Sequence, residues 1–192
     1  KPVGEWQLGS KVKVGGKEAI VAADSKTIDL TENAWKLSFT EDAPKVGETF
    51  NLKGVKSWEG LSEKAKVMMG TGVYETTIKL SKDDAKKQWA IDLGDVRESA
   101  RVYINNKYVG CAWAVPYILN CKDALNKGKN TIRIEVTNLP ANRIAEMDRQ
   151  GVKWRKMKEI NVVDINYKKT TYEKWTPMPS GLNSTVKLVE IK

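Results

Sequence analysis

The chain has 192 residues, 41% of them hydrophobic, with 33 Lys and Arg against 24 Asp and Glu, a net charge of +9. This length suits one large domain or two small ones, and the apolar runs are too short for a transmembrane helix. Histidine is absent, which excludes Ser-His-Asp and Cys-His machinery, HExxH zinc sites and imidazole acid–base catalysis.

Short segments with strand signals recur along the whole chain, separated by breaks of Gly, Asn, Asp and Pro. The clearest is 130–137, where Ile132, Ile134 and Val136 share one face and charged residues lie between them, as in a half-buried strand. The predicted strands are 11–14, 18–22, 35–39, 73–80, 88–93, 100–105, 107–110, 117–121, 130–137, 160–166 and 185–191.

Helical signals are few. The stretch 81–88 predicts one helical turn capped by Ser81, 123–125 predicts a short turn, and 142–158 predicts an irregular helix. Many short strands with few helices predict an all-β fold, an antiparallel β-sandwich of the jelly-roll type. Because there is no repeat, low-complexity tract or linker, we expect residues 1–192 to form a single domain, with a less clearly patterned N-terminal part over about residues 1–50.

The stretch RVYINNKYVG, 101–110, predicts a hairpin. Apolar and polar residues alternate on both sides of Asn105-Asn106, and Asn tolerates the left-handed conformation that a tight turn requires.

The order of segments around this hairpin resembles a known family. GVYETTIKL, WAIDLGDV, ARVYINNKYVG, an aromatic loop ending in PY, and DALNKGKNTIRIEVTN follow one another. This series is similar to the sugar-binding jelly-roll domain of family 2 glycoside hydrolases, a galactose-binding-like β-sandwich.

The motifs on either side of this series indicate which subgroup of these enzymes the chain resembles. KSWEGLSEKAKVMMGTGVYETT, EVTNLPANRI and PMPSGL look like segments in the C-terminal domain of α-L-rhamnosidase-like enzymes. The chain departs from the family pattern at Asn106 (usually Gly), at Asn120 (usually Asp) and at 183–185 (usually Gly-Pro after PSGL).

The resemblance implies a domain that does not cleave bonds itself, because catalytic carboxylates of such enzymes belong to a separate domain. Carboxylates such as Asp92, Glu98 and Glu146 are present, but nothing in the sequence marks the facing pair that glycoside hydrolysis needs. We therefore expect no catalytic residues. No cofactor is assigned, and a structural calcium, compatible with sandwiches of this type, has no ligand signature here.

Aromatic side chains are the first candidates for glycan contact, because indole offers a wide face and an N–H donor. Trp6, Trp35 and Trp89 are expected in the core or at its edge. Trp113 lies in the loop CAWAVPY with Tyr117 nearby, and either glycan or domain contact or plain packing explains it.

The segment 142–158 is the second candidate, because it is basic, aromatic and without strand patterning. It could bind an acidic glycan through Arg–carboxylate bonds and Trp stacking, or it could be a structural loop anchored by an Arg143–Asp148 salt bridge. The same composition could bind single-stranded nucleic acid, but the basic residues form no continuous stripe. The candidate carbohydrate-binding residues are Trp113, Tyr117, Asn142, Arg143, Asp148, Arg149, Trp154 and Arg155.

The net positive charge favours an anionic partner, although scattered, interleaved charges also suit an ordinary solvated surface. Cys111 and Cys121 could form one disulfide, but Cys121 occupies a core-like position that favours free thiols.

The sequence thus predicts a non-catalytic, carbohydrate-associated domain of a glycoside hydrolase that gives structural support. Its expected partners are carbohydrate, an acidic polysaccharide among the candidates, and the catalytic domain of a parent enzyme, without nucleic acid or membrane insertion. Two alternatives stay open: an independent carbohydrate-binding module for an acidic or rhamnose-containing polysaccharide, and a protein-interaction or surface-assembly domain.

No signal peptide is recognisable and the chain lacks an initiator Met, so we expect a processed protein or a piece of a longer one. By resemblance, it would be periplasmic or extracellular.

Overall fold

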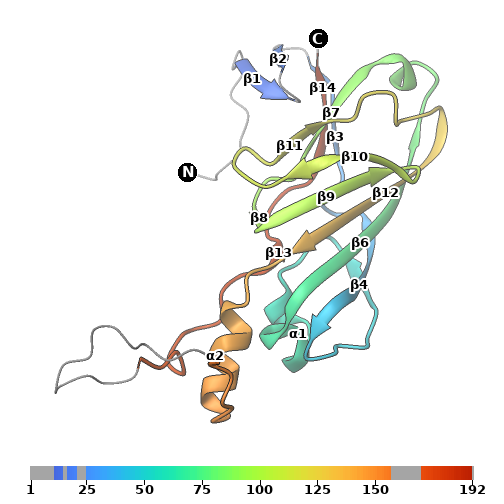
Figure 1. The fold of residues 1–192 in the computed structure, drawn as a ribbon. Helices are drawn as coiled ribbons and strands as arrows, with labels where there is room; N and C mark the ends of the chain where they lie inside the picture. Colours follow the sequence, from blue (N-terminus) through green and yellow to red (C-terminus); the bar gives the residue numbers. More distant parts are fainter. Residues whose placement is uncertain (1–10, 15–16, 21–24, 157–169, 192) are drawn as a thin grey trace.

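Antiparallel strands are the main regular structure of the computed structural model, which describes residues 11–14, 17–20, 25–156 and 170–191 (Figure 1). One sheet has six strands in the order β10-β9-β12-β6-β4-β5, and a second has four in the order β11-β7-β14-β3. Buried residues of both sheets join in one hydrophobic core. The predicted fold class, an all-β antiparallel sandwich, is confirmed. The assignment of residues 1–192 to one domain stays a prediction, because part of the chain lies outside the described residues.

The elements run as follows. The six-stranded sheet contains β4 (Ala34–Ala43), β5 (Phe50–Lys53), β6 (Met69–Leu80), β9 (Ser99–Ile104), β10 (Lys107–Ala112) and β12 (Gly128–Thr137). The four-stranded sheet contains β3 (Thr27–Asp29), β7 (Gln88–Asp92), β11 (Ile118–Asn120) and β14 (Lys187–Ile191). Two small pairs are β1 (Lys11–Val14) with β2 (Lys17–Ile20), and β8 (Val96–Arg97) with β13 (Gly181–Leu182). The helices are α1 (Glu63–Val67) and α2 (Ala141–Arg149), with short 3₁₀ turns η1 (Trp58–Gly60) and η2 (Asp84–Lys86).

Alternating side chains along the strands show which face of each strand lies in the core. Along β12, Ile132, Ile134 and Val136 are fully buried, while the residues between them face outward. Trp35 and Trp89 are each 1% exposed, which confirms the expectation that they lie in the core, whereas Trp6 lies outside the described residues. Burial of such large apolar side chains is the main stabilising contribution in a sandwich.

The predicted hairpin is present between β9 and β10. Asn105 and Asn106 have φ angles of 52° and 63°, the left-handed pair of a tight two-residue turn. The Asn105 amide also donates to Oδ1 of Asn130 at 2.8 Å. Asn130 is fully buried and both ends of its amide are bonded, to Asn105 and to the backbone of Asn126 and Gly128. This network fastens the turn to the start of β12.

Three sequence motifs meet in a buried cluster that we call the tryptophan knot, formed by Trp58, Tyr74, Gly181 and Leu182. Nε1 of Trp58 donates to the Tyr74 hydroxyl at 2.7 Å, and that hydroxyl also accepts the backbone N–H of Leu182 at 3.2 Å. Gly181 has a φ of +89°, and a Cβ there would lie 2.3 Å from both Trp58 Nε1 and the Tyr74 oxygen. Residues of the WEG, GVY and PSGL motifs therefore form a single buried packing contact.

Short edge elements were not predicted. The terminal strands β3 and β5 are brief and partly polar, and β8 and β13 have two residues each, so they carry little periodicity. The short helix α1 was also not predicted. The Ala124 N–H donates to the Cys121 carbonyl and closes a turn over 121–124, slightly before the predicted 123–125. The Ser81 hydroxyl accepts the Asp84 N–H at the start of η2, as expected. The predicted strand 160–166 lies outside the described residues.

The predicted irregular helix over 142–158 is shorter in the structure. α2 ends at Arg149, and Gly151 follows with a φ of +67°. Within the part of the chain that is described, no helix has both the length and the apolarity to cross a membrane.

Both cysteines are free thiols in the structure. Cys111 is exposed and Cys121 is buried. Burial raises the pKa of the Cys121 thiol to about 12, which keeps it protonated and unreactive at neutral pH.

Candidate functional site: a basic groove between α1 and α2

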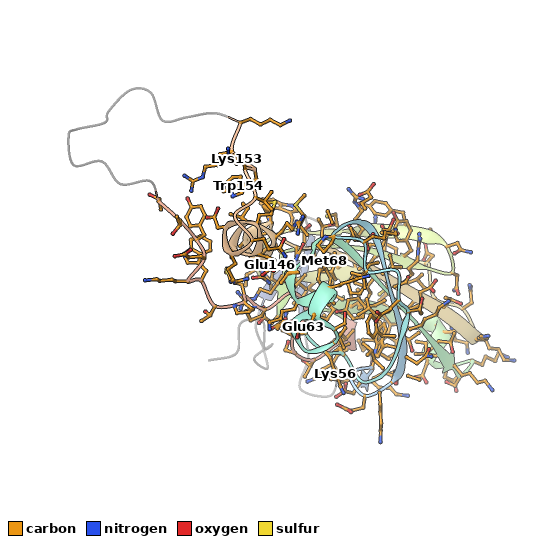
Figure 2. All side chains as sticks on the ribbon, turned by 90° about the horizontal axis from the view of Figure 1, so that it is seen from below. Lys56, Glu63, Met68, Glu146, Lys153 and Trp154 are labelled. Atoms are coloured by element: carbon orange, nitrogen blue, oxygen red, sulfur yellow. The ribbon has the colours of Figure 1, made fainter. Side chains whose placement is uncertain are left out.

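A groove of about 820 Å³ lies where α1, α2 and residues 175–177 come together. Both helices lie at the end of the sandwich away from the C-terminus (Figure 1), and seen from below they pack side by side (Figure 2). Small-molecule sites have volumes of this order. The ionisable lining residues are Glu63, Lys64, Lys66, Arg143, Glu146 and Arg149.

The basic side chains of this groove outnumber the acidic ones. Lys66 lies 3.6 Å from Glu63, and Arg149 pairs with Glu146. Among the described residues, no ion pair involves Lys64 or Arg143, so the groove keeps a net positive charge.

α2 is attached to the sandwich through its first turn. Asn142 is buried, and its amide donates to the carbonyl of Met178 and accepts the Met178 N–H, both at 2.8 Å. This bidentate clamp brings residues 175–177 beside the helix. Asn142 is thus committed to the backbone of its own chain and offers a glycan little surface.

The last turn of α2 holds the segments on both sides of 157–169. Asp148 accepts Nε1 of Trp154 at 2.7 Å and the backbone N–H of Tyr172 at 2.8 Å. A salt bridge to Arg143 was one structural expectation for this carboxylate, but the described part of the chain contains no such pair. Residues five apart on a helix point to different faces, which explains the difference.

Arg149 has a comparable anchoring role. Its guanidinium donates to the carbonyls of Glu173 at 3.0 Å and Trp175 at 3.1 Å, in addition to its pair with Glu146. The Trp175 ring packs on Tyr172 with centroids 4.6 Å apart, yet its side chain is 48% exposed in the groove. Trp175 is therefore an exposed indole whose position is fixed by Tyr172 and by the Arg149 guanidinium.

Arg155 completes an aromatic cluster outside the groove. Its guanidinium lies 5.0 Å from the ring centroid of Trp154 and 5.4 Å from that of Tyr172, and it donates to the Thr170 carbonyl. Figure 2 shows Trp154 beside Lys153, beyond the end of α2. Trp154 and Arg155 thus stack on their own neighbours.

Trp113 and Tyr117 lie elsewhere, between β10 and β11 (Figure 1). Trp113 is 77% exposed, so plain packing does not explain it, and Val115 beside it is also exposed. Tyr117 is buried at the foot of this loop, and burial, together with the negative charge of Glu98, raises the pKa of its phenol. The structure therefore divides the predicted site residues between two regions.

Residues 60–180 match the family described as the glycosyl hydrolase 2 galactose-binding domain-like family. The match covers more than half of the chain, including the hairpin, α2 and Tyr74 of the tryptophan knot, whose other members Trp58, Gly181 and Leu182 lie just outside it. The chain belongs to this family.

Known proteins with related sequences or structures are much longer. A Formosa agariphila protein assigned as a β-glucuronidase is 28% identical over 178 residues, which is 83% of this chain and 15% of that protein. The structure of a rhamnosidase from Novosphingobium sp. PP1Y superposes with a TM-score of 0.69 and 25% identity over 89% of this chain and 16% of that one. A β-D-glucuronidase from Dictyoglomus thermophilum shares the fold, with a TM-score of 0.61 and 16% identity over 88% of this chain and 28% of that one. The predicted resemblance to the family 2 and rhamnosidase-type sandwich is confirmed.

This galactose-binding domain-like chain has no histidine, and among its described residues no group of three or more Cys, Asp or Glu side chains could hold a metal ion. The groove instead offers guanidinium and ammonium groups, one open indole and the amide of Gln150. Such groups bind anionic and hydroxylated ligands without a metal.

Sequence reasoning missed Trp175 and the α1 side of the groove. Trp175 follows Tyr172 in TYEKWTP, so an aromatic pair beside the PMPSGL motif was the available signal. Lys64 and Lys66 lie in a five-residue helix distant in sequence from α2, and no local pattern connects them to it.

Proposed function

We propose that this chain is a non-catalytic accessory domain of a larger glycoside hydrolase, which supports the catalytic domain of its parent enzyme and contacts glycan at the groove. The tryptophan knot carries this proposal. The WEG, GVY and PSGL motifs, which supply Trp58, Tyr74 and Gly181, form buried packing and leave no reactive group open.

The carboxylates support a non-catalytic role. Hydrolysis of a glycoside needs one free carboxylic acid and one carboxylate across the scissile bond. In the groove, Glu63 lies near Lys66 and Glu146 is bound by Arg149, while Asp148 is engaged below them. The chain spans 15% and 16% of two of its relatives, which leaves ample chain for a separate catalytic domain in proteins of that size.

Contact with the catalytic domain is assigned to the loop between β10 and β11. Trp113 and Val115 are 77% and 55% exposed, and a large apolar side chain exposed in this way is typical of a surface that another domain covers.

A periplasmic or extracellular location is part of the same proposal, because polysaccharides are degraded outside the cytoplasm.

An independent carbohydrate-binding module is the second candidate. The open indole of Trp175 beside unpaired basic side chains favours it, since such a site needs no neighbouring domain.

The test compares the isolated chain with the parent enzyme. The isolated chain should fold, judged by circular dichroism, and should hydrolyse no aryl glycoside in a panel that includes glucuronides and rhamnosides. Trp113→Ala should lower the melting temperature of the parent enzyme by several degrees more than that of the isolated chain. If the isolated chain hydrolyses a glycoside and Glu146→Gln abolishes that activity, the non-catalytic role is contradicted. If Trp113→Ala shifts the melting temperatures of the parent enzyme and the isolated chain equally, the contact between the β10–β11 loop and the catalytic domain is contradicted.

A further inference from the structure

We propose that the groove between α1 and α2 binds an anionic oligosaccharide. Arg143 and Lys64 would hold its carboxylate or sulfate group, and Trp175 would stack on a neighbouring pyranose ring. This inference rests on the proposed accessory role and names the ligand class of that site.

Arg143 is the first reason. It lines the groove, it is partly exposed, and no ion pair engages it among the described residues. By contrast, Arg149 is used by Glu146 and by the carbonyls of Glu173 and Trp175. A guanidinium presents a planar fork that fits a carboxylate or sulfate bidentately, so Arg143 is the available anion-binding group.

Trp175 is the second reason. Its ring is fixed by Tyr172 at 4.6 Å, and its backbone by Arg149 at 3.1 Å, while nearly half of its side chain stays exposed. A platform that is already ordered loses little conformational entropy when a ligand binds. The flat apolar face of an indole suits the C–H face of a sugar ring.

The surroundings are the third reason. Lys64 is exposed on the opposite wall, and the Gln150 amide, whose nitrogen donates to Glu146 at 2.7 Å, can accept from a ligand hydroxyl through its oxygen. A neutral glycan would leave the positive charge unused, whereas an anionic one would match it. A single-stranded nucleic acid needs a row of stacking aromatic rings along a basic channel, and the described lining of this groove presents one open indole.

Calorimetric titration of the isolated 192-residue chain provides the test. The probes are an oligogalacturonate, its methyl-esterified form of equal length, a sulfated galactan oligosaccharide and a single-stranded oligonucleotide. The oligogalacturonate or the sulfated probe should bind, and the stronger of the two identifies the anionic group. Esterification should weaken binding of the oligogalacturonate by about tenfold or more, and affinity should fall as salt rises above about 0.15 M.

Matched variants locate the site. Arg143→Gln and Trp175→Ala should each weaken binding by about tenfold. Among the described residues the Arg143 guanidinium makes no ion pair, and the Trp175 ring contributes its contact with Tyr172 at the surface, so both variants should stay folded. Arg101→Gln and Trp113→Ala change an exposed arginine and an exposed tryptophan outside the groove, and they should leave affinity unchanged.

Several results would overturn the proposal. No binding of either anionic probe at millimolar concentration, equal binding of the esterified probe, or tighter binding of the oligonucleotide would each exclude an anionic-glycan groove. Loss of binding in Trp113→Ala but not in Trp175→Ala would move the site to the loop between β10 and β11. In all these cases the non-catalytic supporting role would stand, because that role fails only if the isolated chain is catalytic or the parent enzyme does not depend on the contact.

Discussion

Two tryptophans in this chain, Trp58 and Trp175, have opposite surroundings. Trp58 is fully buried, its N–H is bonded to Tyr74, and Gly72 and Gly181 make room for its ring. Trp175 is held by Tyr172 and Arg149 but keeps 48% of its side chain exposed. Trp58 stabilises the fold, and the open Trp175 in the groove is available to a ligand. Burial therefore assigns Trp58 a structural role, whereas the role of Trp175 must be tested by ligand binding.

The largest expected effect is in the tryptophan knot. Gly181→Ala should lower the free energy of unfolding by about 3 to 5 kcal/mol, because a left-handed alanine is strained and the added methyl group overlaps Trp58 and Tyr74. Urea unfolding measures it. Gly128→Ala is the matched control, with a φ of +87° and no atom within 4 Å, and it should lose only about 1 to 2 kcal/mol. Equal losses would mean that close packing at Gly181 is unimportant.

The Tyr74 hydroxyl should matter next. Tyr74→Phe leaves the N–H groups of Trp58 and Leu182 without their buried acceptor, which should lower the free energy of unfolding by about 2 to 3 kcal/mol. Tyr108→Phe removes an exposed hydroxyl and should change stability by less than about 0.5 kcal/mol. If the two variants unfold at the same urea concentration, the hydrogen bonds of the knot contribute nothing.

Loss of the contacts that support the groove should loosen the chain locally and lower the global stability less than the changes in the tryptophan knot. Asp148→Ala removes the acceptor of Trp154 and of the Tyr172 N–H, so the segments beside α2 should loosen at a global loss of about 1 kcal/mol. Limited trypsin digestion should cleave this region several-fold faster than in the unchanged protein. Asp148→Asn keeps one acceptor oxygen and should lie between the two. An unchanged cleavage rate would show that other contacts hold these segments.

The smallest effect is a pH dependence at the edges of the fold. Burial raises the pKa of Asp42, but hydrogen bonds from the Val46 N–H and the Lys45 ammonium outweigh it and bring the pKa below its ordinary 3.8. Hydrogen bonds from Lys26 and Ser81 likewise lower the pKa of Asp84. A depressed carboxyl pKa stabilises the folded state above the unfolded pKa, and this contribution disappears as pH falls through the folded value.

Stability should therefore decline as the pH falls below about 4, and the decline should be shallower in Asp42→Asn. Chemical unfolding at a series of acidic pH values measures this slope. An identical slope in the variant would show that Asp42 does not contribute.

The sequence predicted the strands that carry their own periodicity. β12 alternates buried residues with exposed or half-buried ones from Lys129 to Thr137, and Asn105-Asn106 has the turn chemistry of its hairpin. β3 and β5 carried too little pattern, because a short strand at the edge of a sheet is defined by its hydrogen-bonded neighbour.

The candidate site was predicted in part. The basic character of 142–158 pointed to the region of α2, and the structure brings Arg143 and Arg149 of that stretch into one groove. Asn142 and Asp148 instead bond to the chain itself, and whether any of the candidates contacts glycan stays a prediction. Spacing along a sequence cannot tell which polar side chain of a helix will be used by a neighbouring segment.

By itself the sequence determined the family, the sandwich and its core, since alternation, turn residues and motif order are local properties of the chain. Only the tertiary structure showed that WEG, GVY and PSGL form one buried contact, and that α1, α2 and Trp175 enclose a basic groove. Both features join segments far apart in sequence, and their geometry depends on burial and on hydrogen bonds that exist only after the two sheets have packed.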